Sequence, residues 1–285
     1  MRKIAYCLLT IILATSNVFS QADSVGPLNV IEIRHYKQQE GQRQNFIDYF
    51  EEHFIDTQEE EGMAILGQLR VIDKPNETVW VRAFENMQSR LRGLKGFYFG
   101  PVWAKYAPPM AQMHAGIKNA YLLKPLGNID ELTKGHRAQD IAATLASGTI
   151  SAVTGVVAID FYYTKPGELS NFTKFFEERL KPAITEQGHE TLGYFISELA
   201  TNDFQMPVVQ DENLLVVISM YPSQEIYQQK KDEFYASEPW VSQLHDAAQA
   251  MLSKEVETLL LQPTLRSPLR YWDKKKAADQ ETAVK

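Results

Sequence analysis

The sequence is poor in the residues and motifs that support several common chemistries. Its single cysteine, Cys7, lies in an apolar stretch near the N-terminus. A chain cleaved after that stretch would have no thiol, which excludes disulfides, zinc–thiolate and iron–sulfur sites, and a cysteine nucleophile. The sequence also lacks an HExxH motif, a GxSxG motif and a glycine-rich phosphate loop. It therefore shows no signature of a zinc protease, a serine hydrolase or a nucleotide-binding enzyme.

Positive charge is also in short supply. The 285 residues carry a formal net charge of −7. A nucleic-acid partner needs a basic surface to contact the phosphate backbone, so we expect no nucleic-acid binding. The six histidines show no helical i, i+4 pair, and we expect neither a metal site nor a cofactor.

The N-terminus has the pattern of a secretory signal peptide. Arg2 and Lys3 precede an apolar run over residues 4–14, and small or aliphatic residues precede a cleavage position after Ser20. The run is shorter than the roughly 20 residues that span a bilayer. We predict a signal peptide over residues 1–20, a periplasmic or secreted protein, and no membrane insertion.

The rest of the chain is an internal repeat. Residues 30–46 (VIEIRHYKQQEGQRQNF) match residues 156–172 (VVAIDFYYTKPGELSNF). The same offset relates Gly62 to Gly188 and the Leu-Gly pair at 66–67 to that at 192–193. Trp103 matches Trp240 at a larger offset, because residues 201–212 form a longer connection than residues 73–77. A constant offset that changes at one loop indicates a tandem duplication.

Each copy is predicted as strand, helix, strand, strand, helix, strand, the order of a ferredoxin-like unit. In the first copy these elements are 29–36, 42–58, 63–72, 78–84, 86–113 and 119–124. In the second they are 155–162, 169–186, 191–199, 213–221, 224–251 and 255–261. The predicted boundaries are a first domain over 21–126, a linker over 127–153, a second domain over 154–272, and a disordered tail over 273–285.

Two such units have a natural way to cover each other. A four-stranded sheet with its helices on one face leaves the other face bare, and two bare faces can close into one eight-stranded barrel. We therefore predict an α+β fold in which the two units pack sheet to sheet as a fused dimeric α+β barrel. The oligomeric state is open, and a homodimer remains an alternative.

Several residues of the first copy, in order, resemble the NIPSNAP domain of the dimeric α+β barrel superfamily. They are Ile31-Glu32-Ile33-Arg34-His35-Tyr36, Gly41, a Phe-rich helix, Leu66-Gly67, Trp80, Arg90 and Pro101-x-Trp103. The resemblance implies the barrel fold and no single reaction. The second copy departs from the pattern: Ala158 and Asp160 replace Glu32 and Arg34, we match Trp80 and Arg82 to Val216 and Ile218, and Arg90 has no clear counterpart.

Strand alternation gives a candidate ligand site. Glu32, Arg34 and Tyr36 share one face of the first strand, and Asp160 and Tyr162 share the matching face in the second copy. We expect the apolar alternate positions to lie under the helices and the polar set to line the barrel interior. The predicted ligand-binding residues are therefore Glu32, Arg34, Tyr36, Trp80, Arg82, Asp160 and Tyr162, and no catalytic residue is assigned.

Three functions follow from this candidate site. Glu32–Arg82 and Arg34–Asp160 could be internal ion pairs that join the two copies, or the charges could await a ligand, since unpaired buried charge is costly. We favour a small-molecule or partner-binding protein. The first alternative is an enzyme similar to the cofactor-independent monooxygenases of the superfamily, with Tyr36 or Arg34 assisting proton transfer. The second is a protein–protein interaction scaffold.

Overall fold

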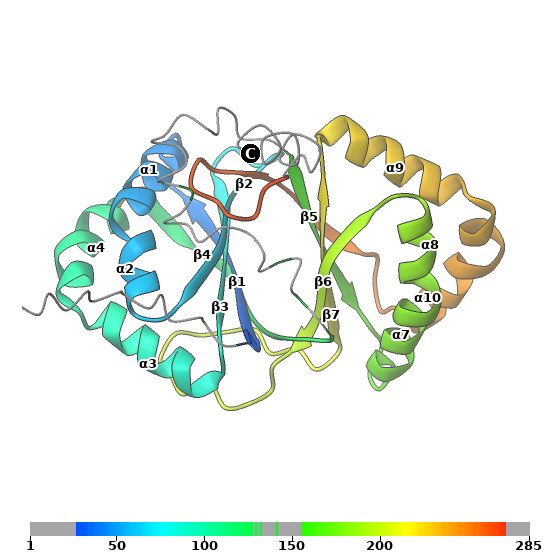
Figure 1. The fold of residues 1–285 in the computed structure, drawn as a ribbon, viewed down its shortest axis with the longest axis horizontal. Coiled ribbons are helices and arrows are strands. Elements are labelled where there is room, and N and C mark those ends of the chain that lie inside the picture. Colours follow the sequence, from blue (N-terminus) through cyan, green and yellow to red (C-terminus); the bar gives the residue numbers. More distant parts are fainter. Residues whose placement is uncertain (1–26, 128, 130–131, 133–140, 142–154, 272–285) are drawn as a thin grey trace, which may run out of the picture.

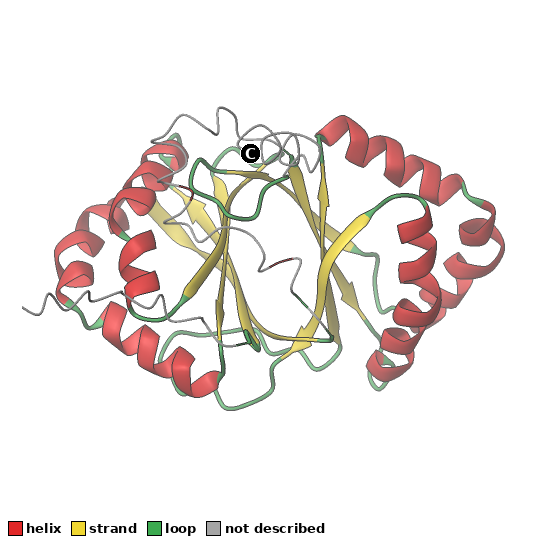
Figure 2. Cartoon of the chain, viewed as in Figure 1, coloured by secondary structure: helices red, strands yellow, loops and turns green. Residues whose placement is uncertain are grey.

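The computed structural model describes residues 27–127, 129, 132, 141 and 155–271. Two sheets face each other at the centre, and a layer of helices covers each of them on the outside (Figures 1 and 2). The predicted signal peptide, most of the predicted linker and the predicted tail lie outside the described residues. No helix within the described residues is long and apolar enough to cross a membrane.

The first half has the predicted order of elements. Strand β1 (Val30–Gln38) leads into helices α1 (Arg43–His53) and α2 (Ile55–Glu60). Strands β2 (Ala64–Val71) and β3 (Glu77–Phe84) form a hairpin, followed by helices α3 (Met87–Tyr98) and α4 (Pro101–Met113) and by strand β4 (His114–Pro125). Asn86 caps α3, and its side chain accepts a hydrogen bond from the Ser89 amide in a capping box. Pro101 is the first residue of α4, and the break between α3 and α4 lies just before it.

The second half repeats this order. Strand β5 (Val156–Tyr163) is followed by α7 (Leu169–Phe175), a π-helical turn over Phe176–Leu180, and α8 (Lys181–Glu186). Strands β6 (Glu190–Ser197) and β7 (Leu214–Tyr221) precede α9 (Gln224–Ala236), a second π-helical turn over Trp240–Leu244, α10 (His245–Met251) and β8 (Glu257–Pro263). Ser223 caps α9 as Asn86 caps α3.

The described strands form one closed barrel in the order β1-β3-β2-β8-β5-β7-β6-β4. Within each half the neighbouring strands are antiparallel, as in β1–β3 and β5–β7. The halves are joined at two seams, where β2 pairs with β8 and β4 pairs with β6. Closure leaves no free sheet edge, and it confirms the predicted fusion of two ferredoxin-like units into an α+β barrel.

The barrel interior is apolar, which corrects one expectation. Ile31, Ile33 and Val81 belong to a core that also contains Val157 and Ile159 of the other half, so these positions face inward. Phe50, Trp80 and Leu122 instead form a second core beneath the helices of the first half. The alternation of the strands was predicted correctly, but the face was not: Glu32, Arg34, Tyr36, Trp80 and Arg82 lie under the helices and not in the barrel interior.

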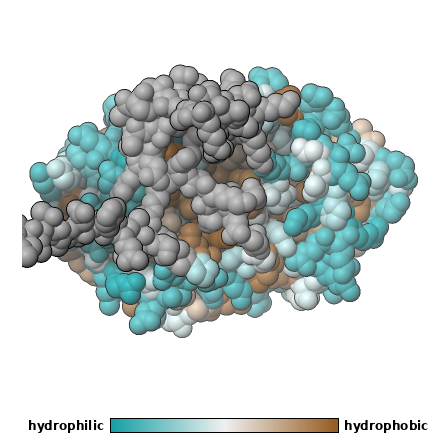
Figure 3. Space-filling view, in the orientation of Figure 1, coloured by the Kyte–Doolittle hydropathy of each residue, from teal (hydrophilic) through white to brown (hydrophobic). Residues whose placement is uncertain are grey.

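The outer surface is mainly hydrophilic over the helices of both halves in the view of Figure 3. Each helical layer meets its sheet through a row of phenylalanines. Phe46, Phe50 and Phe54 of the first half are buried, as are Phe172 and Phe176 of the second. Their four-residue spacing places them on one helix face, which fixes how the helices lie on the strands.

Candidate functional site

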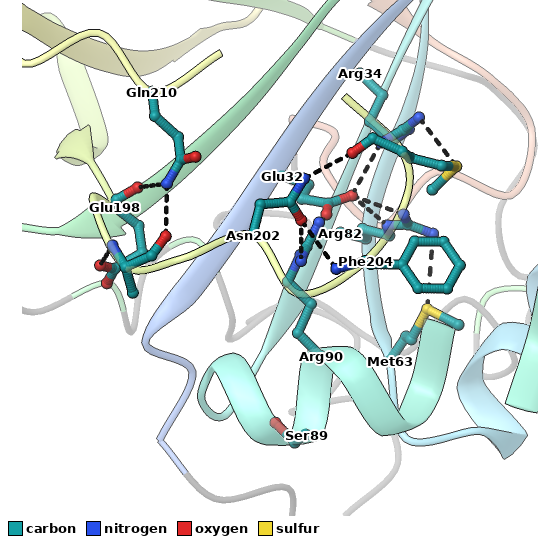
Figure 4. A network of polar contacts seen from close by, with 12 residues as sticks. Glu32, Arg34, Met63, Arg82, Ser89, Arg90, Glu198, Asn202, Phe204 and Gln210 are labelled. Atoms are coloured by element: carbon teal, nitrogen blue, oxygen red, sulfur yellow. Dashed lines mark hydrogen bonds and ion pairs between the residues drawn. The ribbon is translucent and has the colours of Figure 1, made fainter. Parts of the chain in front are cut away.

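Four charged side chains lie completely buried between the sheet and the helices of the first half. Glu32 and Arg34 come from β1, Arg82 from β3 and Arg90 from α3, and each of the four is 0% exposed. Glu32 and Arg82 are directly opposed across the β1–β3 pair. Figure 4 shows the three guanidinium groups gathered about the one carboxylate. We call these four residues the arginine cluster.

Glu32 binds all three arginines. Its Oε1 accepts a hydrogen bond from Arg90 Nε at 2.6 Å, and its Oε2 accepts one from Arg82 Nε at 2.8 Å. Arg82 Nη2 also lies 2.7 Å from Oε2. Arg34 Nη1 donates to the same oxygen over a longer 3.3 Å. The Glu32–Arg82 ion pair was one of the predicted alternatives, and it lies within one half and does not join the two.

Electrostatics keep Glu32 ionised. Burial alone would raise the pKa of its carboxyl, but the charges of Arg82, Arg34 and Arg90 outweigh burial and lower the pKa to about 2. One negative charge then faces three positive ones in a region without water contact. Buried charge of one sign is costly unless it is paired, so the arginine cluster has the composition of a site for a further anion.

Two arginines of the cluster have a donor that is weakly bonded or unbonded, Arg34 and Arg90. Arg34 Nε donates to the Tyr36 hydroxyl at 2.7 Å. Its Nη2 contacts the sulfur of Met206 at 3.8 Å, a weak acceptor. Arg90 Nη2 is buried without a hydrogen-bond partner among the described residues. Donors on two of the three arginines are therefore available to a ligand oxygen.

An aromatic shell surrounds Arg34. The Tyr36 ring lies 5.7 Å from Trp80 and 5.1 Å from the imidazole of His114, both edge to face. Trp80 Nε1 and His114 Nε2 are buried, and neither finds a hydrogen-bond partner in the described part of the chain. Burial, and then the charge of Arg34, lower the pKa of His114, so its imidazole is neutral at pH 7. The shell thus holds a neutral base beside a cation.

A segment of the second half covers this region. Residues 201–212, between β6 and β7, cross to the first half, where Val209 exchanges backbone hydrogen bonds with Ala120 and Leu122 of β4. Asn202 Oδ1 accepts from Arg90 Nη1 at 3.0 Å, and the buried Phe204 packs on Tyr98. The longer loop that changes the repeat offset is therefore the cover of the arginine cluster (Figure 4).

The second half has a different set of residues at the equivalent place. The strand registers pair Glu32 with Arg82 and Ala158 with Ser219, so Arg82 corresponds to Ser219 and Trp80 to Val217. The match of Trp80 and Arg82 to Val216 and Ile218 was wrong by one residue, because Val216 points into the barrel. The shared cap positions Asn86 and Ser223 align Arg90 with Tyr227, a counterpart that the sequence comparison had not found.

The seven predicted site residues therefore fall into two places. Glu32, Arg34, Tyr36, Trp80 and Arg82 come together in the first half, as the sequence predicted. Asp160 and Tyr162 lie under the helices of the second half, where Tyr162 packs on Phe172, so the predicted Arg34–Asp160 pair does not form. Sequence reasoning missed His114, Gln58, Asn202 and Met206, because helix ends and a loop from the other half place them. The described residues contain no group of three metal-ligating side chains.

The whole chain resembles solved α+β barrels. Neither a protein-family model nor a curated protein sequence matches it. A "putative monooxygenase" from Lactobacillus acidophilus NCFM aligns with a TM-score of 0.52 and 12% identity, over 82% of this chain and 93% of that one. An "anthrone oxidase-like protein" aligns with a TM-score of 0.50 and 8% identity, over 83% and 91%. At these identities the likeness establishes a common fold.

A half of the chain is also similar to single-domain proteins. A NIPSNAP family protein from Agrobacterium tumefaciens C58 aligns with a TM-score of 0.36 and 16% identity, over 42% of this chain and 96% of that one. The strand pairing of this chain shows one closed α+β barrel built from two ferredoxin-like halves.

Proposed function

We propose that this protein is an oxygenase that needs no metal or organic cofactor and acts on an electron-rich aromatic substrate bound as its oxyanion in the first half. The observation that carries the proposal is the net positive charge of the arginine cluster, which is fully buried and lies beside an aromatic shell. The reaction class is supported by the whole-chain likeness to barrels named as a putative monooxygenase and as anthrone oxidase-like. The proposed kinship with NIPSNAP domains is supported by the sequence pattern of the first copy. We also propose that the protein is exported, on the basis of the signal-peptide pattern over residues 1–20.

Arg34 is the residue that we expect to contact the substrate oxyanion. Its Nη2 faces only the Met206 thioether among the described residues, and a phenolate or enolate oxygen is a far better acceptor. The Tyr36 hydroxyl is held beside it by the 2.7 Å bond to Nε. A buried cation lowers the pKa of a phenol or carbon acid bound next to it, because it stabilises the charged form.

The acceptor of the proton is His114. Its imidazole is neutral and its Nε2 is free of hydrogen bonds within the described structure, whereas Glu32 is bound to three guanidinium groups and has a pKa of about 2. Glu32 therefore positions the arginines and is a poor base. Deprotonation of the CH₂ carbon of an anthrone gives an enolate, which can add O₂. The resulting peroxide anion takes that proton to give a hydroperoxide, which loses water to leave a ketone, so one O₂ is consumed and one water is released per quinone.

The test is oxygen uptake with anthrone itself. Purified protein and anthrone are mixed in an oxygen electrode, and anthraquinone is followed by absorbance, with buffer alone giving the spontaneous rate. We expect a protein-dependent rate with one O₂ per anthraquinone. Arg34→Met should lower kcat/KM at least about tenfold, because the oxyanion loses its counter-charge. His114→Gln should lower kcat with little change in KM.

The matched control is Arg179→Met, which removes an exposed arginine of the second half. It should leave the rate unchanged. A wild-type rate equal to that of buffer would overturn the enzymatic proposal. Anthrone binding that is lost in Arg34→Met, without oxygen uptake, would instead identify a binding protein, the second candidate, which the unbonded donor of Arg90 and the weakly bonded donor of Arg34 equally support.

A further inference from the structure

The second half carries a polar site of opposite charge at the place equivalent to the arginine cluster. Asp160 of β5 occupies the position of Arg34. Arg34 lies two residues after Glu32, which is paired with Arg82, and Asp160 lies two residues after Ala158, which is paired with Ser219. Ala158 and Ser219 replace Glu32 and Arg82, and Tyr227 replaces Arg90. The duplication has thus exchanged three arginines and a glutamate for one carboxylate that has no arginine at the matching positions.

The Asp160 carboxylate is held by a hydroxyl of the neighbouring strand. Its Oδ1 accepts a hydrogen bond from the Thr258 hydroxyl of β8 at 2.5 Å. Burial raises the pKa of its carboxyl, and the Thr258 hydrogen bond and the charge of Lys231 oppose that rise. A cation placed beside the carboxylate would stabilise its ionised form.

Tyrosine side chains surround this carboxylate. Tyr221 and Tyr227 meet edge to face with centroids 5.1 Å apart, and both pack against Ala158, which is small enough to leave the rings room. Burial, and then the negative charge of Asp160, raise the pKa of Tyr227 to about 12 and the pKa values of Tyr221 and Tyr235. These rings present electron-rich faces close to a carboxylate, the combination that recognises organic cations.

The chain already places an ammonium group at this site. Lys231, on the same helix as Tyr227, holds its Nζ 5.7 Å from the centroid of the Tyr227 ring. Its charge is the one that lowers the pKa of Asp160. The lysine side chain is a primary ammonium group on an alkyl chain, and this is the ligand chemistry that we expect the carboxylate and the ring to bind.

The site reaches solvent at one edge only, since Tyr221 is 4% and Tyr227 is 8% exposed. Tyr235 is 44% exposed, and Thr258 is exposed on β8. Ala120 of β4 is the counterpart of Thr258, because each is paired with the residue at the Arg34 or Asp160 position. In the first half Val209 covers Ala120. The corresponding connection of the first half, residues 72–76, is short and remains at the β2–β3 turn, where it bonds to β1 and α1.

We propose that Asp160, Tyr221, Tyr227 and Thr258 form a second binding site, specific for a primary alkylammonium group, for which the neighbouring Lys231 competes. The ammonium donates to Asp160 and lies against the Tyr227 ring. The site is independent of the proposed oxygenase reaction, since none of its residues contacts the arginine cluster.

The test uses n-butylammonium, which reproduces the lysine side chain. The full chain, labelled with ¹⁵N, is titrated at constant ionic strength, with sodium chloride as the matched salt, and amide shifts near Asp160 and Thr258 are followed. Lys231→Met should tighten binding several-fold, because the internal competitor is gone. Asp160→Asn should weaken it at least about tenfold. Tyr227→Phe, which keeps the ring, should bind, and Tyr227→Leu should not.

Lys174→Met, which removes an exposed lysine elsewhere in the second half, is the control and should bind as wild type. Unchanged affinity in Asp160→Asn would overturn the proposal, and so would equal shifts with sodium or weaker binding in Lys231→Met. Thermal melting of each variant separates lost binding from lost folding. Arg34→Met should bind n-butylammonium normally, so failure of the oxygenase proposal leaves this result intact.

Discussion

At the scale of single residues, alternation along β1 identified the groups that lie together but not the side on which they lie. Residues 30–35 are buried on both faces, one against the barrel core and one against the helices. Period-two patterning fixes a face only when the other face meets water. The apolar set faces the barrel, where it packs in one core with Val157 and Ile159 of the other half. The charged set is accommodated under the helices, where Arg90 and Gln58 supply hydrogen bonds.

Glu32 should make stability depend on acid pH. Its pKa is lowered from the ordinary 4.5 to about 2, so its contribution is fully present above about pH 4.5 and is lost as the pH falls through 2. The shift corresponds to roughly 3 kcal/mol of unfolding free energy. Urea unfolding from pH 2 to 7 should show this loss in wild type.

Glu32→Gln should abolish this part of the pH dependence. The variant leaves three buried arginines without a carboxylate and should be less stable at pH 7 by about 3–5 kcal/mol. Glu178→Gln, at an exposed position, is the control. An unchanged pH profile in Glu32→Gln would show that the carboxylate is not the group responsible.

At the scale of elements, the sequence predicted the order of strands and helices and most of their bounds, but β4 begins at His114 and not at residue 119. Long periodic segments such as 42–58 and 224–251 carried that information, because their apolar faces repeat with a helical period. The π-helical turns at Phe176–Leu180 and Trp240–Leu244 left no such signal. The one-residue error at Trp80 could have been avoided from the sequence, because the offset of 137 that relates Trp103 to Trp240 also relates Trp80 to Val217, the residue that the β5–β7 pairing places there.

The segment 201–212 illustrates what a sequence withholds. Its greater length was visible as a change in the repeat offset, yet its destination was not, because Val209, Asn202 and Phe204 contact residues of the other half. A loop's partners depend on the closure of the barrel, which brings β4 beside β6. The covered arginine cluster therefore needed the tertiary structure to be recognised.

Phe204 should be the residue that holds this cover in place. It is 4% exposed, whereas Leu199 in the same connection is 57% exposed. Phe204→Ala should accelerate hydrogen exchange of residues 201–210 by at least about tenfold, as measured by mass spectrometry, because local opening loses its largest apolar contact. Leu199→Ala should leave the exchange unchanged, and equal rates in both variants would argue against the anchor.

At the scale of the whole molecule, each half depends on the other to cover its sheet. The inward-facing residues of β1 and β3 belong to the same apolar core as those of β5 and β7. Residues 21–126 expressed alone should be insoluble or should dimerise through this face, because a large bare apolar sheet is not stable in water. Sedimentation and thermal melting check this, and a monomeric half with a cooperative transition would contradict it.

The two seams of the barrel, β2–β8 and β4–β6, have a consequence for how such a protein can change. In a symmetric dimer one gene encodes both sites, so any substitution appears twice and a buried arginine in one site must be accommodated in the other. Joining the two units on one chain removes that constraint. Arg34 and Asp160 occupy matching positions with opposite charge, a pairing that no identical pair of subunits could display. The fused barrel can therefore serve two unlike ligands with one fold, each under separate selection.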